Sequence, residues 1–407
     1  MIRKYSFRKD KKAIHRIWQE CGWIGREKQE LEALDRFVGV SDCWVAELDG
    51  NAESMATSTP GTFFHSGTPL QLAAITSVTT SRVARNQQTA SRTVARLVSE
   101  QAFRGAQLSG LGIFEQGFYD RLGYGNGAYE HMVRFDPAWL VRLGTPRVPV
   151  RLGRDDWKEI HEARFSRRKL HGAVDLTPPE ISLCEMDWSK NVFGLGYREN
   201  GKLTHFFVAH ADEVETGPYR IDWMVYRSVY EFRELLALVR GLGDQVRQGR
   251  MREPRDVQLQ SLMKKPFQLH TITQEGKFTS RVAAYAYWQM RILDLPSCVS
   301  AVHARASLRF NLRLQDPLSR FVDDDAPWRG CGGDYVVELG EESTAHPGSD
   351  PELPELKATV GDFTRFWMGG TRADVLAGLH SFRAPADLIQ ALDAALVLPK
   401  PAPDWDF

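Results

Sequence analysis

The spacing of apolar residues in the first third of the chain predicts alternating strands and helices. Cys43–Leu48 has the pattern of a strand, whereas Asp10–Cys21 carries apolar residues at helical spacing. A longer helix follows, because apolar residues recur every three or four positions with charged residues between them; the apolar set is Ala90, Val94, Leu97, Val98 and Ala102. Gly105 is expected to end this helix. The pattern predicts an α/β fold for this part of the chain.

Two features indicate where this first unit turns and where it closes. Pro60-Gly61 predicts a turn, since both residue types favour turn conformations. After a strand at Gln107–Phe114 and a short helix at Gly117–Leu122, the segment Ala128–Phe135 again has the pattern of a strand. We expect this last strand to close the first unit.

A linker rich in proline and glycine runs from Phe135 to Arg154. Beyond it the order of predicted elements resembles that of the first unit and includes an amphipathic helix at Val229–Arg247. A third unit begins near Ile292. We therefore expect three domains, at residues 1–145, 146–291 and 292–407.

The charge balance argues against nucleic acid as a partner. The chain of 407 residues has 52 Lys+Arg and 52 Asp+Glu, so its formal net charge is zero. A protein that binds nucleic acid through phosphate contacts normally shows a basic surplus. Apolar stretches such as Val282–Trp288 fall far short of the roughly 20 residues that span a bilayer, so no membrane partner is expected either.

The cysteines and the N-terminus predict a cytoplasmic protein. The five cysteines are odd in number and include no C-x-x-C pair, which argues against a disulfide framework and against a thiolate zinc site. The basic start of the chain has no apolar core of the kind that a secretory signal requires.

The first candidate site is the turn between a strand and a helix within Ile75–Arg92. A helix N-terminus leaves backbone N–H groups free and carries the positive end of the helix dipole, so it can bind an anion. Arg82, Arg85 and Arg92 surround this turn and would add charge for phosphates. From spacing alone, a solvated helix start remains the alternative.

The second candidate is the segment Glu115–Gly125, which directly follows a predicted strand. Its glycines at positions 117, 123 and 125 suggest tight turns on both sides of a short helix. Tyr119 would then lie beside the end of the strand, where a phenol could donate a proton to a leaving thiolate. Taken alone, an aromatic residue in such a motif is more often a core residue, and that interpretation of Tyr119 is the alternative.

Other polar residues give weaker signals. The histidines include no H-E-x-x-H motif, and we expect no metal site. The acidic run Asp323–Asp325 is expected to be a solvated loop. Asp406, near the end of the chain, could attract a cationic amine, although an exposed acid in the tail is the alternative.

Together, the two candidate sites resemble the acetyl-CoA-binding half of the GNAT acetyltransferase fold. The stretch E-x-G-F-Y-x-R-L-G-Y-G is similar to the corresponding segment of the Eis (enhanced intracellular survival) acetyltransferases. The resemblance extends to length and to the terminal Phe407. It implies two tandem GNAT-like domains, the first carrying the acetyl-CoA site and the second structural, followed by an α/β domain like sterol carrier protein. It also implies a homo-oligomer, with a hexamer as the expected form.

The resemblance assigns roles to individual residues. Tyr119 would be the general acid, and the terminal carboxylate of Phe407 would be the general base. The acetyl-CoA pyrophosphate would bind to the turn, at Val78, Thr79, Thr80, Arg85, Asn86, Gln87, Gln88, Thr89 and Ala90. The implied reaction is direct attack by an amine on the thioester, and the amine could belong to an aminoglycoside, a polyamine or a lysine side chain. Asp406 would help to bind that amine.

One position departs from the family pattern. The family motif R-x-x-G-x-A has glycine where this chain has Gln88. Glycine lets a backbone approach the pyrophosphate closely, because no Cβ intervenes. An acyl-CoA sensor without catalysis therefore stays open as an alternative to an enzyme. A lipid-binding protein that uses the C-terminal domain also stays open, because the resemblance to sterol carrier protein implies a domain that can enclose apolar ligands.

Overall fold

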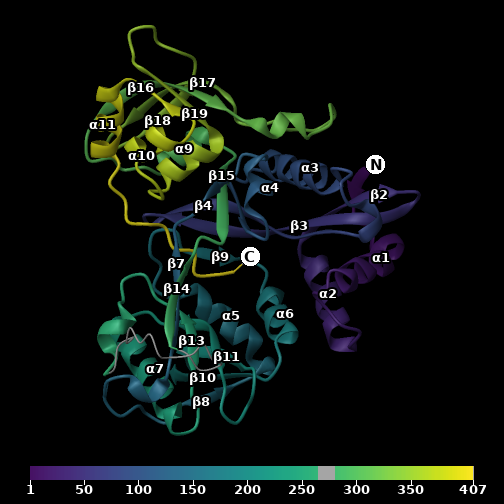
Figure 1. Cartoon of the computed structure of the whole chain (residues 1–407), viewed down its shortest axis with the longest axis vertical. Coiled ribbons are helices and arrows are strands. Elements are labelled where there is room, and N and C mark those ends of the chain that lie inside the picture. Colours follow the sequence, from purple (N-terminus) through teal and green to yellow (C-terminus); the bar gives the residue numbers. More distant parts are fainter. Residues whose placement is uncertain (265–279, 407) are drawn as a thin grey trace, which may run out of the picture. The chain divides into compact units, whose positions relative to one another are not determined.

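The structure is a computed structural model that describes residues 1–264 and 280–406. The chain forms two compact units (Figure 1). Unit 1 comprises Met1–Ala128, Lys169–Pro178 and the chain from Ala286 onward, and unit 2 comprises Tyr129–Arg168 and Pro179–Tyr285. No helix among the described residues is both long and apolar enough to cross a membrane.

Unit 1 contains a mixed sheet of eight strands among the described residues. The order across the sheet is β1 (Ile2–Lys4), β2 (Asp42–Leu48), β3 (Asn51–His65), β4 (Thr68–Thr80), β5 (Leu108–Gly112), β15 (Trp288–Ile292) and β6 (Gly125–Asn126), and β9 (Val174–Leu176) pairs with β3. β4 and β5 are parallel neighbours, whereas the other pairs in this sheet are antiparallel.

Helices cover both faces of this sheet because successive residues of β3 point to opposite sides. Met55 faces α1 (Phe7–Glu20), whose Trp18 donates its indole N–H to the Met55 sulfur at 3.3 Å. The next residue, Ala56, packs in one core cluster with Val94 and Val98 of α3 (Thr89–Phe103). In Figure 1, α1 and α2 (Lys28–Val40) lie on one side of β3, and α3 lies on the other.

The turn predicted at Pro60-Gly61 is wrong, because β3 runs through both residues and pairs Pro60 with Ala73. Gly61 serves a close approach of backbone instead. A Cβ at this position would lie 2.4 Å from the carbonyl oxygen of Asp175 in the neighbouring strand β9. The chain turns later, at Ser66-Gly67, where φ is 49° and 96°.

The strand predicted to close the first unit belongs to the other unit. β7 (Glu130–Phe135) pairs with β13 (Gly249–Arg252) and β14 (Arg281–Tyr285) in the sheet of unit 2. In unit 1 the strand that lies between β5 and β6 is β15, which comes from the far end of the chain.

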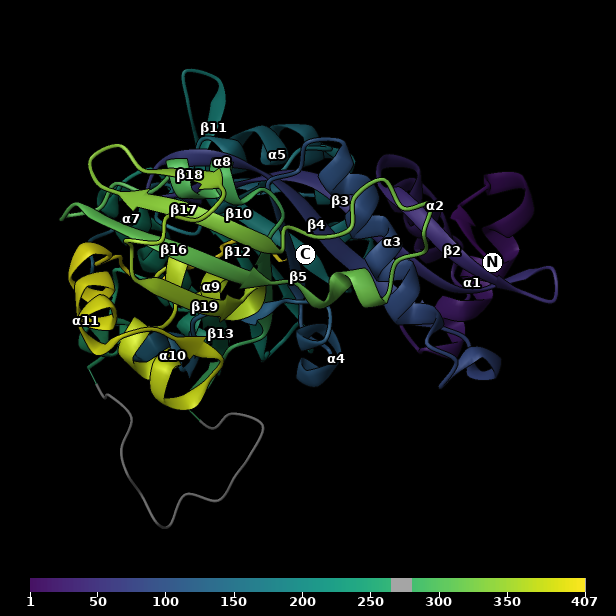
Figure 2. The ribbon, with the colours of Figure 1, turned by 90° about the horizontal axis from the view of Figure 1, so that it is seen from above.

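The C-terminal part of unit 1 adds a five-stranded sheet, seen with α10 and α11 in Figure 2. Its order is β18 (Thr344–Pro347), β17 (Gly333–Leu339), β16 (Leu308–Gln315), β19 (Glu355–Thr359) and β20 (Phe382–Arg383), and its helices are α8 (Leu295–Ser300), α9 (Val360–Trp367), α10 (Ala373–Leu379) and α11 (Ala386–Ala395). The predicted likeness to sterol carrier protein and the division into three domains stay predictions.

The acidic run Asp323–Asp325 is not simply solvated. Asp323 pairs with Arg92 at 2.6 Å and Asp325 pairs with Arg96 at 2.8 Å, both on α3, whereas Asp324 is fully exposed and pairs with Arg329. Arg92 therefore binds an acid of the chain itself, although the sequence suggested that it would add charge for a phosphate.

Unit 2 has its own seven-stranded sheet within the described residues. The order is β14, β7, β13, β12 (Tyr219–Val225), β11 (Lys202–Ala211), β10 (Val192–Glu199) and β8 (Val150–Leu152). Its helices are α5 (Trp157–Phe165), α6 (Glu180–Trp188) and α7 (Val229–Gly241). The buried face of α7, which includes Phe232 and Leu235, packs against Phe207 of β11, as the amphipathic pattern of this segment predicts.

Candidate functional site

The turn before α3 has the backbone shape of an anion-binding loop. After β4 and a short 3₁₀ turn, Asn86 and Gln88 adopt left-handed conformations with φ of 63° and 57°. Gln88 is the N-cap of α3, and no side chain among the described residues caps this helix end. Because the first N–H groups of a helix have no acceptor within the helix, they face outward at the positive end of its dipole.

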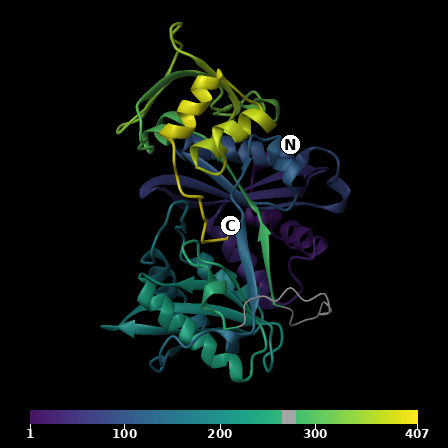
Figure 3. The same ribbon diagram turned by 60° about the vertical axis from the view of Figure 1, so that its left-hand side comes forward.

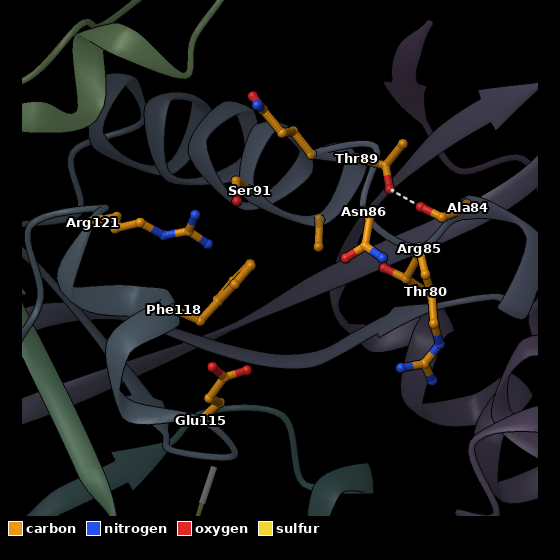
Figure 4. A pocket seen from close by; sticks show the side chains of 11 residues that line it. Thr80, Ala84, Arg85, Asn86, Thr89, Ser91, Glu115, Phe118 and Arg121 are labelled. Atoms are coloured by element: carbon orange, nitrogen blue, oxygen red, sulfur yellow. Dashed lines mark hydrogen bonds between the residues drawn. The ribbon is translucent and has the colours of Figure 1, made fainter.

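A cavity of about 580 Å³ opens at this helix start (Figure 4). It is formed by the end of β4, the turn, the first turn of α3 and the segment that follows β5. The lining residues are Thr80, Ala84, Arg85, Asn86, Gln88, Thr89, Ala90, Ser91, Glu115, Phe118 and Arg121.

The cavity lies where two parallel strands separate. β4 and β5 pair from Leu72–Leu108 to Ile75–Leu111, and no further pairing is formed although β4 continues to Thr80. Ser77 in β4 has a φ of 56°, which interrupts the regular strand at the point where pairing has ended. Ligands of open α/β sheets bind outside the carboxyl ends of such strands, and this opening has that position.

Two arginines supply positive charge to the cavity wall. Arg85 comes from the turn and Arg121 from the segment after α4 (Gln116–Asp120). Among the described residues neither guanidinium is paired with an acid, and that of Arg121 lies 5.3 Å from the ring centroid of Phe118. Arginine forms strong paired hydrogen bonds to phosphate, so the cavity suits a ligand with several phosphate groups.

Six of the nine predicted cofactor-binding residues line the cavity, namely Thr80, Arg85, Asn86, Gln88, Thr89 and Ala90. The other three have different surroundings. Val78 packs against the core. Thr79 is buried, and its hydroxyl donates to the Ser77 carbonyl at 3.4 Å. Gln87 is exposed, and its amide N–H donates to the Val83 carbonyl at 3.3 Å.

The sequence reasoning missed Ala84, Ser91, Glu115, Phe118 and Arg121. A signal for two of them was present. Phe118 and Arg121 lie three positions apart, so they share one face of the short helical segment. Figure 4 shows both side chains directed toward the start of α3.

Tyr119 lies next to the cavity but does not line it. Its side chain is only 6% exposed and packs in the core cluster with Leu122 and Tyr124, and its ring centroid lies 4.8 Å from that of Phe118. Burial raises the pKa of the Tyr119 phenol well above its usual value. The hydroxyl therefore stays protonated at neutral pH, which is the state that a proton donor requires.

The last described residue, Asp406, is exposed, and its Oδ1 accepts a hydrogen bond from the Tyr287 hydroxyl. Phe407, the predicted general base, lies outside the described residues.

One group of possible metal ligands occurs in the described part of the chain, within unit 2. Ligand atoms of Glu199, His205 and Glu231 lie within 4.8 Å of one another. Arg227 already donates to Glu199 at 3.1 Å and also to Glu231, so both carboxylates are neutralised by a side chain. The expectation of no metal site stays a prediction.

Comparisons with known proteins agree with this geometry. Residues 2–127 match the family model described as an acetyltransferase (GNAT) domain. A search of curated proteins finds no match.

Several solved structures share the fold over the whole chain. A probable N-acyltransferase from Enterococcus faecalis is 17% identical with a TM-score of 0.80, covering 100% of this chain and 99% of that one. Eis1 from Mycobacterium abscessus is 17% identical with a TM-score of 0.77, and a GCN5-related N-acetyltransferase from Kribbella flavida is 16% identical with a TM-score of 0.76; each comparison covers 100% of both chains.

These findings confirm the predicted α/β fold with tandem GNAT-like units and the resemblance to Eis-type proteins. Residues 2–127 match the acetyltransferase (GNAT) domain model, and the chain has, over its full length, the fold of Eis1 from Mycobacterium abscessus.

Proposed function

We propose that this chain is an acetyl-CoA-dependent N-acetyltransferase that acts on an amine by direct attack on the thioester. The observation that carries the proposal is the cavity at the uncapped start of α3, with Arg85 and Arg121 on its wall. Backbone N–H groups of Thr89, Ala90 and Ser91 would hold the pyrophosphate, and the two arginines would neutralise its charge.

The reaction needs one proton acceptor and one proton donor. A neutral amine attacks the thioester carbonyl, so that a C–N bond forms and the C–S bond breaks. The carboxylate of Phe407 would accept the proton that the amine loses, and Tyr119 would protonate the departing thiolate. Asp406 would bind the amine while it is still cationic.

Gln88 bears on the alternative of a sensor that binds acetyl-CoA without catalysis. Its φ of 57° is the backbone conformation that glycine adopts most easily, so the turn keeps its shape without the glycine of the family motif. A Cβ and a side chain are nevertheless present at the cavity wall.

One cavity on the C-terminal sheet gives little support to a lipid carrier. It measures about 270 Å³ and is lined mainly by polar side chains, namely Gln315, Lys357, Ser381 and Arg383, together with Ala358. The homo-oligomer, its hexameric form and the cytoplasmic location remain predictions beside this proposal.

Thermal unfolding with and without acetyl-CoA, followed by an amine panel read by thiol release, tests the proposal. A ligand at 100 times its Kd stabilises the folded chain by about 2.7 kcal/mol. The panel contains a polyamine, an aminoglycoside and a lysine peptide, and Arg121→Ala serves as the variant with a damaged cavity. Stabilisation without thiol release would favour the sensor, and stabilisation by fatty ligands alone would favour the carrier.

A further inference from the structure

The C-terminal tail is held along unit 1 by a series of contacts. Residues 396–406 form no helix or strand (Figure 3 shows this extended segment in yellow). The backbone N–H of Ala402 donates to the His171 carbonyl at 3.1 Å, and a Cβ on Gly172 would lie 2.4 Å from the same nitrogen. Further along, Oδ1 of Asp404 accepts a hydrogen bond from the Val174 N–H at 3.1 Å, and Trp405 is 2% exposed.

The final contact of the described tail brings it to the end of β5. The Tyr287 hydroxyl donates to Oδ1 of Asp406. The carbonyl of the same tyrosine accepts the backbone N–H of Ile113 at 2.5 Å, and Ile113 is the residue directly after β5. Tyr287 thus connects the tail to the strand end from which Glu115 and Phe118 continue into the cavity wall.

We propose that Tyr287 is a positioning residue for the acceptor amine, because its hydroxyl holds the Asp406 carboxylate beside the end of β5. This inference rests on the proposed function. A phenol that donates to a carboxylate forms a charge-assisted hydrogen bond, which is short and directional. A carboxylate can accept about four hydrogen bonds, so one that a phenol orients can also bind an ammonium group.

Two substitutions separate the anchoring of the tail from the charge at its end. Tyr287→Phe removes only the hydroxyl. Asp406→Asn removes the charge but keeps an oxygen that can accept from Tyr287. Tyr335→Phe is the matched control. The Tyr335 hydroxyl, in β17, donates to the Cys331 carbonyl at 2.9 Å and has no hydrogen bond to the described residues of the tail.

The first measurement is steady-state kinetics with a saturating cosubstrate, accompanied by melting temperatures. Tyr287→Phe is expected to raise KM for the amine about tenfold, as the loss of a charge-assisted hydrogen bond implies, with KM for acetyl-CoA within about twofold of wild type. Adding Tyr287→Phe to Asp406→Asn is expected to change KM for the amine little further, since the charge that Tyr287 positions is already gone.

The second measurement does not depend on turnover. Carboxypeptidase removes the chain end, and mass spectrometry follows its loss. Tyr287→Phe and the double variant are expected to lose the end fastest. Asp406→Asn, whose neutral oxygen still accepts a weaker hydrogen bond from Tyr287, should lose it more slowly than Tyr287→Phe, and Tyr335→Phe should match wild type.

An unchanged KM for the amine in Tyr287→Phe would overturn the inference, as would an unchanged rate of chain-end loss. A joint rise of both KM values with a lower melting temperature would also overturn it, because that result shows a purely structural role. If the wild-type chain acetylates no amine, the proposed function fails, and the role assigned to Tyr287 fails with it. Turnover by wild type with an unchanged Tyr287→Phe would refute the inference alone.

Discussion

Replacing Gln88 by glycine tests how the turn before α3 works. Gln88 has φ of 57° and ψ of 11°, a left-handed conformation that costs a residue with a Cβ about 1–2 kcal/mol. Glycine avoids this cost but loses about 0.5–1 kcal/mol in backbone entropy on folding. Since Gln88 makes no capping hydrogen bond that would be lost, we expect Gln88→Gly to stabilise the chain by about 0–1.5 kcal/mol.

The effect on cofactor binding is separate, because the strain of the turn is present both with and without ligand and cancels from the affinity. Only the space and the hydrogen bonds of the side chain remain. If the side chain crowds the pyrophosphate, Gln88→Gly should bind acetyl-CoA more tightly by about 1 kcal/mol, or about fivefold.

Gln88→Ala is the matched variant, since it shortens the side chain but keeps both Cβ and the strained backbone. If only Gln88→Gly binds acetyl-CoA more tightly, Cβ is the obstacle. If Gln88→Ala also binds it more tightly, the obstacle is the part of the side chain beyond Cβ. Calorimetry measures the affinity, and urea titration measures the free energy of unfolding. Unchanged or weaker binding in Gln88→Gly would refute the crowding argument, and weaker binding in both variants would show that the Gln88 amide donates to a phosphate.

Four further changes test the site and its support. Tyr119→Phe should lower kcat by about 10²–10⁴ with acetyl-CoA affinity unchanged, and a normal rate would make Tyr119 a core residue. Tyr124→Phe is the control and should stay active, because it loses only a buried hydrogen bond to Ser109. Because burial raises the pKa of Tyr119, activity should show no loss from its ionisation between pH 7 and its ordinary value of about 10. Arg121→Ala should weaken acetyl-CoA binding about tenfold in calorimetry, and equal affinity would remove Arg121 from the site. A few residues added after Phe407 should abolish most thiol release while acetyl-CoA still raises the melting temperature, and full activity would refute the terminal carboxylate as base. Arg291→Met leaves the carboxylate of Asp316 buried without its partner, which should cost about 3–5 kcal/mol in urea titration.

Local pattern was enough to predict the elements that build the cavity. The apolar face predicted for the helix after the turn, with Val94, Leu97 and Val98, is buried in α3. This prediction succeeded because it depends on neighbours within a few positions along the chain. The free N–H groups and positive dipole of the helix start also predicted an anion-binding turn, and that role stays a prediction.

Contacts between distant segments were not predictable in the same way. Gly61 was assigned to a turn, yet it is required because the β9 backbone approaches it from more than 100 residues away in sequence. The apolar pattern of Ala128–Phe135 fits a strand of either sheet, so it could not show that β7 pairs within unit 2. Arg121 was missed because its place in the cavity depends on how α4 is directed after β5, which spacing does not specify.

Residues 2–127, which match the acetyltransferase (GNAT) domain model, do not contain the whole of the core that surrounds α3. β15 lies between β5 and β6, and Leu318 and Val322 pack in the same cluster as Val94 and Tyr119.

One fully buried side chain joins these parts. Arg291 of β15 donates to the Leu122 carbonyl at the end of the α4 segment, and it pairs with Asp316 at 2.5 Å. A buried charge requires such partners, because an unpaired one would cost several kcal/mol. The segment that carries Tyr119 and Arg121 is therefore held by residues more than 160 positions further along the chain. The cavity wall after β5 depends on the C-terminal part of unit 1 for its structure, just as the proposed reaction depends on the tail for its base.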